Sequence, residues 1–139
     1  MSFREKSAWI TLISVVICFS AYFWALATGE IDARGMRSLH VGLLCTTALV
    51  LLQIVLNLIA TLLNLKDART PRDEREKSIQ ARSHTVGYYV LMATIAVQIV
   101  PMHFRDPNPA DVVHYGVLGL VAAVFAVAVA QIVMFRRGT

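Results

Sequence analysis

Apolar residues dominate four stretches of this chain: 8–28, 39–65, 85–104 and 112–135. Each stretch reaches the roughly 20 helical residues needed to cross a hydrocarbon core about 30 Å thick. None of them has Asp, Glu, Lys or Arg in its interior. Because every backbone polar group in lipid must be satisfied within its own segment, stretches of this length predict helices. The pattern predicts an all-α integral membrane protein, a single domain over residues 1–139 built as a bundle of four transmembrane helices.

Composition agrees with this prediction. The 139 residues are 57% hydrophobic and only 16% charged. The longest hydrophilic segment, 66–84, is too short to form a second folded core. We therefore expect the protein to act in the membrane, at the membrane surface or through a partner.

The basic residues predict the orientation of the bundle. Ten of the 13 Lys and Arg residues lie in the N-terminal tail, the segment 66–84 and the C-terminal tail. The other three, Arg34, Arg37 and Arg105, lie in the two remaining loops. Since short cytoplasmic loops are enriched in Lys and Arg, both termini and the central loop are predicted to be cytoplasmic. The net charge of +4 is then a signal of topology, and we expect no direct nucleic-acid binding.

Local signals predict where the first span begins and ends. Ser2 and Glu5 have the spacing of a capping box, so the first helix is expected to begin before the membrane. Trp9 is expected at the cytoplasmic interface. Tyr22 and Trp24 are expected near the outer interface, as members of an aromatic belt.

The central loop carries the signals of a helix. Thr70 is the expected N-cap, and Pro71 suits the first helical position. Acidic side chains follow in the first turn, where the helix dipole favours them, and Asp73 is spaced to pair with Lys77. We expect this helix to continue into the third span.

The same loop contains a recognisable motif. It reads Asp73-Glu74-Arg75-Glu76, then Ile79 and Arg82, with Gly87-Tyr88-Tyr89 at the start of the span. Together with the N-terminal Phe3-x-Glu5-Lys6-Ser7-Ala8-Trp9, it resembles small, largely uncharacterised prokaryotic membrane proteins with four spans. Such proteins are often thought to accompany small helix-turn-helix regulators. The resemblance therefore implies a regulatory role in a prokaryotic inner membrane.

The motif residues are candidates for an interaction surface: Asp73, Glu74, Arg75, Ile79 and Arg82. Arg75 and Arg82 could contact carboxylates of a partner or phosphates of lipids. The alternative is a solvated, capped helix whose positive charge only fixes the topology.

Amide side chains lie within the spans. Gln53 and Asn57 are four residues apart and so share a helix face, which Asn64 continues. Such amides usually hydrogen-bond between helices, and Gln98 and Gln131 are the expected partners. The alternative is a polar path for a solute or ion, lined by Gln53, Asn57, Gln98 and Gln131.

The fourth span is rich in small residues. Ala122, Ala126 and Ala130 recur every four positions, which is the spacing of a face that permits close helix packing. We expect this face to pack within the bundle or against a second copy of the chain.

Three histidines could carry chemistry. His40, His103 and His114 are predicted at the outer ends of three different helices. Residues of a kind that could join them as metal ligands lie nearby: Met36, Met102, Glu30, Asp32, Asp106 and Asp111. If the helix ends converge, these groups would suit copper, zinc or haem iron. Because each histidine is alone in its helix, interfacial histidines without a metal are the alternative.

Several functional classes are not supported. Small multidrug transporters of four spans use an acidic residue within the membrane, and none of these spans has one. A Cys-x-x-Cys pair, a Ser/His/Asp arrangement and a phosphate-binding loop are also missing. The sequence favours a non-enzymatic regulatory or accessory subunit that acts by interaction, as a homodimer or with another membrane or cytoplasmic protein. The alternatives are a metal- or haem-binding protein and a small transporter.

Overall fold

The computed structural model describes residues 3–31, 36–63, 73–104 and 109–137. These parts of the chain form four helices and no strand: α1 (Phe3–Ala27), α2 (Met36–Leu63), α4 (Glu74–Phe104) and α5 (Pro109–Arg137). All four are long and apolar enough to cross a membrane. The prediction of an all-α protein with four membrane-spanning helices is confirmed at this level.

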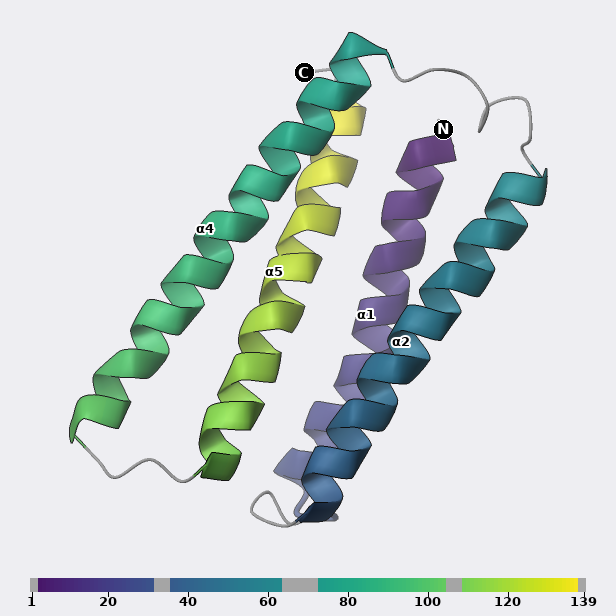
Figure 1. The fold of residues 1–139 in the computed structure, drawn as a ribbon. Coiled ribbons are helices and arrows are strands. Elements are labelled where there is room, and N and C mark those ends of the chain that lie inside the picture. Colours follow the sequence, from purple (N-terminus) through teal and green to yellow (C-terminus); the bar gives the residue numbers. More distant parts are fainter. Residues whose placement is uncertain (1–2, 32–35, 64–72, 105–108, 138–139) are drawn as a thin grey trace.

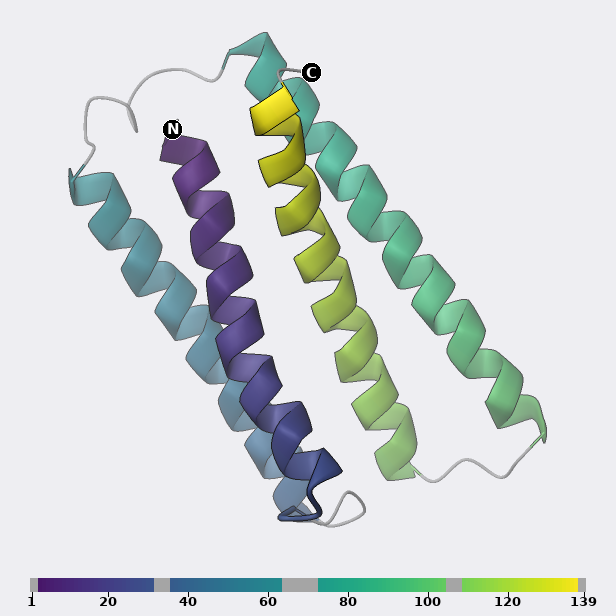
Figure 2. The same ribbon diagram turned by 180° about the vertical axis from the view of Figure 1, so that it is seen from behind.

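The four helices form a row in the order α4, α5, α1, α2 (Figures 1 and 2). α5 packs along α4 on one side and along α1 on the other, and α1 also packs along α2. The first and last helices of the sequence are therefore the two central helices of the row. Both chain termini lie at the same end of the bundle, together with the start of α4 (Figure 1).

α4 combines the charged part of the central loop and the third span in one continuous helix, as predicted. Its 31 residues correspond to a length of about 46 Å at 1.5 Å per residue. The helix also continues past Pro101 to Phe104, so this proline does not end it.

The start of α4 differs from the prediction. The backbone carbonyl of Asp73 accepts the N–H of Lys77 at 3.1 Å, and its Oδ1 accepts the N–H of Glu74 at 2.8 Å. Asp73 is therefore the N-cap, because its side chain and carbonyl satisfy N–H groups that the first turn leaves open. Thr70 and Pro71, the predicted start, lie outside the described residues. Because the Asp73 carboxylate accepts a backbone hydrogen bond, it forms no ion pair with Lys77 among the described contacts.

The buried core lies where α1, α2 and α5 meet. Val15, Phe19 and Tyr22 of α1 are its centre, at a spacing that places them on one side of the helix. Side chains from all three helices pack around them: Cys18, Phe23, Leu26, Val41, Cys45, Leu49, Val117 and Val121. This cluster is small and lies towards the end of the bundle opposite the termini, and four further buried apolar residues among those described lie nearer the termini: Ala8, Ile79, Ala128 and Ile132.

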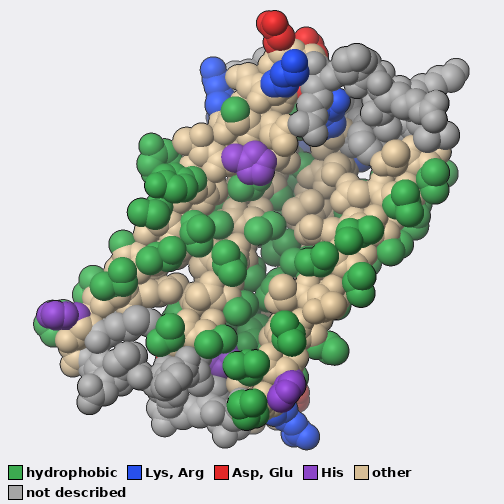
Figure 3. All heavy atoms as spheres, in the orientation of Figure 1, with side chains coloured by type: hydrophobic (Ala, Val, Ile, Leu, Met, Phe, Trp, Pro, Cys, Tyr) green, Lys and Arg blue, Asp and Glu red, His purple; other side chains and the backbone are tan. Residues whose placement is uncertain are grey.

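Most other large apolar side chains are exposed on the outside of the helices. Figure 3 shows hydrophobic side chains along the length of the bundle, with charged side chains near its two ends. Lipid tails are as apolar as these side chains, so their exposure carries no penalty in a bilayer. In water, apolar surface on this scale would cause association. The surface thus matches a multi-pass membrane protein.

α4 and α5 pack closely at two glycines, one on each helix. Gly87 of α4 lies against Val127 and the carbonyl of Ala123, and a Cβ added at Gly87 would overlap Val127 Cγ2. A Cβ at Gly119 of α5 would lie 3.1 Å from Thr94 Oγ1. Gly119, Ala123 and Val127 recur every four residues and so form one face.

The predicted row of Ala122, Ala126 and Ala130 is only half-buried. α5 is rich in small residues on more than one side because it has a helix on each flank. The four-residue spacing occurs in two adjacent rows, and the sequence does not indicate which row meets Gly87.

Replacing Gly87 with Ala should weaken the packing of α4 on α5. The new methyl group meets a β-branched side chain that is stiff about χ1, and overpacking of this kind costs about 1–3 kcal/mol. The measurement is thermal unfolding of the purified protein in detergent. Gly116→Ala is the matched control, since a Cβ there meets nothing within 4 Å. Adding Val127→Ala should recover part of the lost stability, because it removes the side chain that the new methyl group meets. If the stability of the double variant equals the sum of the two single effects, this account is contradicted.

Candidate functional site

The start of α4 is held against the bundle by one face of the helix. Glu76, Ile79 and Ser83 share this face because they are spaced by three and four residues. Glu76 Oε2 lies 2.9 Å from Arg4 Nε of α1, and both side chains are largely buried. Ile79 is 1% exposed, and the hydroxyl of the fully buried Ser83 accepts Gln131 Nε2 of α5 at 3.2 Å. The first three turns of α4 are thus fixed to both central helices.

A second charged contact joins α1 and α5 at the same end. Arg136 Nε lies 3.6 Å from Glu5 Oε1, and the guanidinium carbon lies 5.5 Å from the centroid of the Trp9 ring. Glu5 is therefore used in packing between helices, while Ser2, its predicted capping partner, lies outside the described residues. Trp9 is at the predicted end of the bundle. This cluster of charges joins α1, α4 and α5 where both termini lie.

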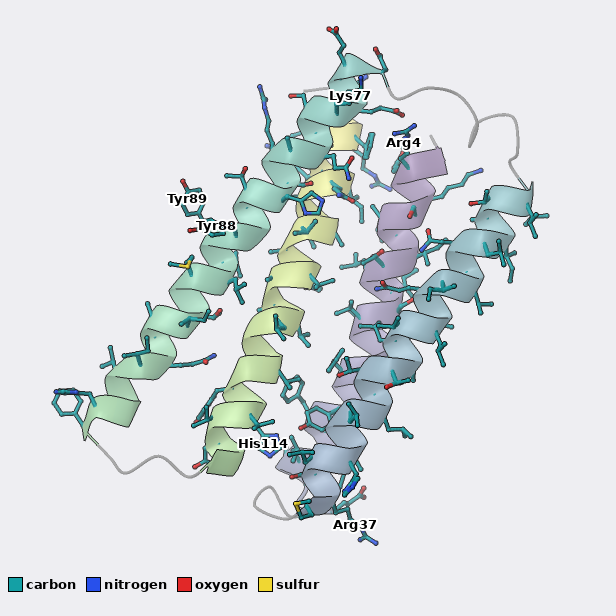
Figure 4. The ribbon with its side chains drawn as sticks, viewed as in Figure 1. Arg4, Arg37, Lys77, Tyr88, Tyr89 and His114 are labelled. Carbon is teal, nitrogen blue, oxygen red and sulfur yellow. The ribbon has the colours of Figure 1, made fainter. Side chains whose placement is uncertain are left out.

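Other side chains of the first turns of α4 are exposed beside this packed face. Glu74, Arg75 and Arg82 are exposed. Arg75, Arg82 and Tyr89 are seven residues apart and so lie on one stripe. Tyr88 and Tyr89 are 59% and 66% exposed, and Figure 4 shows both directed away from α5.

The sequence motif therefore divides into two parts. Ile79 is a packing residue, together with Glu76, which pairs with Arg4. Asp73 caps the helix. Glu74, Arg75 and Arg82 remain on the outer surface, so only these three of the predicted interaction residues are available to another molecule. We refer to Glu74, Arg75, Arg82, Tyr88 and Tyr89 as the outer face of α4.

The amides in the spans bond between helices, but not to one another. Asn57 Oδ1 accepts the hydroxyl of Ser7 of α1 at 2.6 Å, and its Nδ2 donates to the Gln53 carbonyl of its own helix at 2.8 Å. Gln98 Nε2 of α4 donates to the Tyr115 carbonyl of α5 at 2.7 Å. The expected pairing of Asn57 with Gln98 or Gln131 is wrong, because each of these amides bonds a different residue.

These bonds also weaken the transporter alternative. Asn57, Gln98 and Gln131 each form a hydrogen bond to a neighbouring helix, so they do not form a common polar lining. Asn64 lies outside the described residues.

Tyr22 occupies a different environment from the predicted aromatic belt. It is 2% exposed, and its hydroxyl lies 2.7 Å from Nδ1 of His114 on α5. Gly42 of α2 permits the approach, since a Cβ there would lie 3.2 Å from the Tyr22 hydroxyl oxygen. Trp24 is 68% exposed, as expected for a residue of the belt. The Tyr22–His114 pair is a polar contact at the junction of three helices.

The three outer histidines do not assemble into a metal centre within the described residues. No group of three His, Cys, Asp or Glu side chains there could hold a metal ion. His40 Nδ1 bonds the Met36 carbonyl at 2.7 Å, and the His103 ring lies edge-on to Phe104. His40 and His103 belong to the two outer helices of the row, whereas His114 faces α1 (Figure 4). Asp32 and Asp106 lie outside the described residues.

No protein-family model matches this chain, and no curated protein or solved structure is significantly similar to it. The resemblance of the loop motif to small prokaryotic four-span proteins therefore stays a prediction.

Sequence reasoning missed the contacts that hold α4 in place. Arg4 and Glu76 have opposite charges at the same end of the bundle, which is a signal that could have suggested their pairing. No local signal relates Ser83 to Gln131, because their helices are recognised as neighbours only in the folded bundle.

Exchanging the charges of Arg4 and Glu76 tests the anchor of α4. Arg4→Glu and Glu76→Arg should each lower stability by about 1 kcal/mol, because each places like charges side by side. Each should also speed hydrogen exchange in the first turns of α4. The double variant should recover much of both effects. If the loss of stability in the double variant equals the sum of the losses in the two single variants, the pair does not hold α4.

Proposed function

We propose that this protein is a non-enzymatic membrane subunit that binds a partner protein through the outer face of α4. One observation carries the proposal. The first turns of α4 are anchored by Glu76, Ile79 and Ser83, while the flanking Arg75 and Arg82 are exposed. A purely solvated loop helix would need no such anchoring.

The chemistry of this face suits a protein partner. Two guanidinium groups one heptad apart can each bind a carboxylate through two parallel hydrogen bonds. Tyr88 and Tyr89 continue the face into the apolar part of the helix. Tyrosine and arginine are enriched at protein interfaces. A helix already held in place loses little conformational entropy on binding, which favours affinity. The partner expected from this surface has acidic groups near the membrane and an apolar part within it.

The proposal includes a location. We infer a prokaryotic inner membrane, with the end that carries both termini in the cytoplasm. Arg4, Arg75, Arg82, Arg136 and Arg137 all lie at that end of the described helices, and cytoplasmic ends of membrane proteins are enriched in such residues. The regulatory or accessory role is what the resemblance of the loop motif implies.

Reversing the two arginines should release the partner. The experiment uses the full chain with an affinity tag, crosslinked in its native membrane and then purified in detergent. Arg75→Glu with Arg82→Glu should reduce recovery of the crosslinked partner about tenfold or more, which corresponds to about 1.4 kcal/mol. Arg137→Glu, an exposed basic residue at the same end, is the matched control and should leave recovery unchanged.

One outcome would count against this proposal. If the Arg75→Glu, Arg82→Glu variant and the Arg137→Glu control recover the partner equally, the outer face of α4 is not the contact surface. The double Glu variant could lose the partner because it is less stable, which a lowered unfolding temperature would show. Arg75→Gln with Arg82→Gln then separates lost stability from lost binding, because it removes the charges without adding new ones. A crosslinked product of twice the chain mass would identify the partner as a second copy.

The orientation can be measured separately. A green fluorescent protein fused after Thr139 should fluoresce, because that domain folds in the cytoplasm and not after export. Alkaline phosphatase fused at the same position should be inactive. The opposite pair of results would place the basic end outside the cell and remove the cytoplasmic part of the proposal.

A further inference from the structure

The end of the bundle opposite the termini carries a shallow groove of about 440 Å³ on α2. Four side chains line it: Arg37, His40, Val41 and Leu44. We propose that this groove binds the phosphodiester headgroup of an anionic phospholipid. The inference concerns a different end of the molecule from the outer face of α4 and does not depend on the proposed partner.

The four lining residues form one continuous face of α2. Their spacing of three, four and seven residues from Arg37 places them on the same side of the helix over its first two turns. The polar groups come first, at the end of the span, and the apolar groups follow towards its middle. Figure 4 shows Arg37 at the end of α2, directed away from the other helices. A phospholipid has the same order of chemistry, with an anionic phosphate at the surface and acyl chains below it.

Arg37 supplies the permanent charge of the site. Its side chain is exposed, and the parts of the chain that the structure describes contain no ion pair to it. A guanidinium can bind two phosphate oxygens at once through its planar fork of N–H groups. The charge is therefore available for a phosphate.

His40 is held in an orientation that leaves one nitrogen for a ligand. Its Nδ1 lies 2.7 Å from the Met36 carbonyl oxygen, and a carbonyl can only accept, so Nδ1 carries a proton. Nε2 remains as the second nitrogen of the ring.

The apolar wall distinguishes a lipid from a free phosphate ion. Leu44 is exposed in the groove, and Leu43 beside it is exposed as well. An acyl chain can cover these side chains, whereas inorganic phosphate would leave them bare. A zwitterionic headgroup carries its own cation, so the charge of Arg37 should favour a lipid with net negative charge.

The experiment measures lipid binding by the full chain in a neutral detergent after lipid removal. Dioleoyl phosphatidylglycerol is added, and bound lipids are counted by native mass spectrometry. The same titration is made with dioleoyl phosphatidylcholine and with inorganic phosphate. We expect the anionic lipid to bind best. Arg37→Gln should weaken its binding about fivefold, as one basic residue near a membrane surface contributes. Arg137→Gln, an exposed arginine at the opposite end of the bundle, is the matched control and should bind as the unaltered protein does.

Each other outcome would overturn the proposal. Equal binding of the two lipids would show that the groove does not select for charge. Undiminished binding by Arg37→Gln would place the lipid elsewhere. Displacement of the lipid by inorganic phosphate at the same concentration would identify a free anion as the ligand. Arg37→Lys keeps the charge without the planar fork and should bind with intermediate affinity. Its unfolding temperature should equal that of the unaltered protein, because position 37 is exposed.

Discussion

Between helices in lipid, apolar side chains gain little by leaving the acyl chains for a neighbour. Association then depends on close packing of backbones and on polar contacts. Each neighbouring pair in the row has a contact of this kind. α4 and α5 meet at Gly87 and Val127, α5 and α1 share the Tyr22–His114 pair, and α1 meets α2 through Ser7 and Asn57. Polar contacts of this type contribute roughly 0.6–2 kcal/mol each, so a few of them can set the order of the row.

Much of the fold could be predicted from the sequence because the bilayer makes strong demands on composition. Length and the absence of charge identify the spans, and the acidic first turn predicts that the central loop enters the third span as a helix. The order of the helices could not be predicted in the same way. Each span is apolar around its whole circumference, so no face is identified as the one that packs. The wrong pairing of Asn57 follows from this.

Tyr22 illustrates the same difficulty for a single residue. A tyrosine near the end of a span suits both an interface and a buried site with a partner for its hydroxyl. The partner, His114, comes from the last helix, and the approach depends on Gly42 of a third. Only the assembled bundle decides between the two environments. The central-loop motif presents the same difficulty. Its residues were predicted as one interaction surface, but in the bundle Glu76 and Ile79 pack inward whereas Arg75 and Arg82 are exposed.

The two faces of α4 separate stability from recognition. Substitutions on the inner face change how the helix is held, whereas substitutions on the outer face leave the packing untouched. The charged cluster at the termini and the groove at the far end of α2 also lie on opposite ends of the bundle. Changes to one of these surfaces are therefore expected to leave the other intact.

The central helices α1 and α5 come from opposite ends of the chain, and Tyr22 and His114 are 92 positions apart. During synthesis α1 is made before α5, with a buried tyrosine that has no partner until α5 follows. The two halves of the row, α1 with α2 and α4 with α5, are sequential hairpins, and the first can form before the second is made. Their union has to wait for α5, so a chain shortened before α5 would leave α1 with its polar side towards lipid.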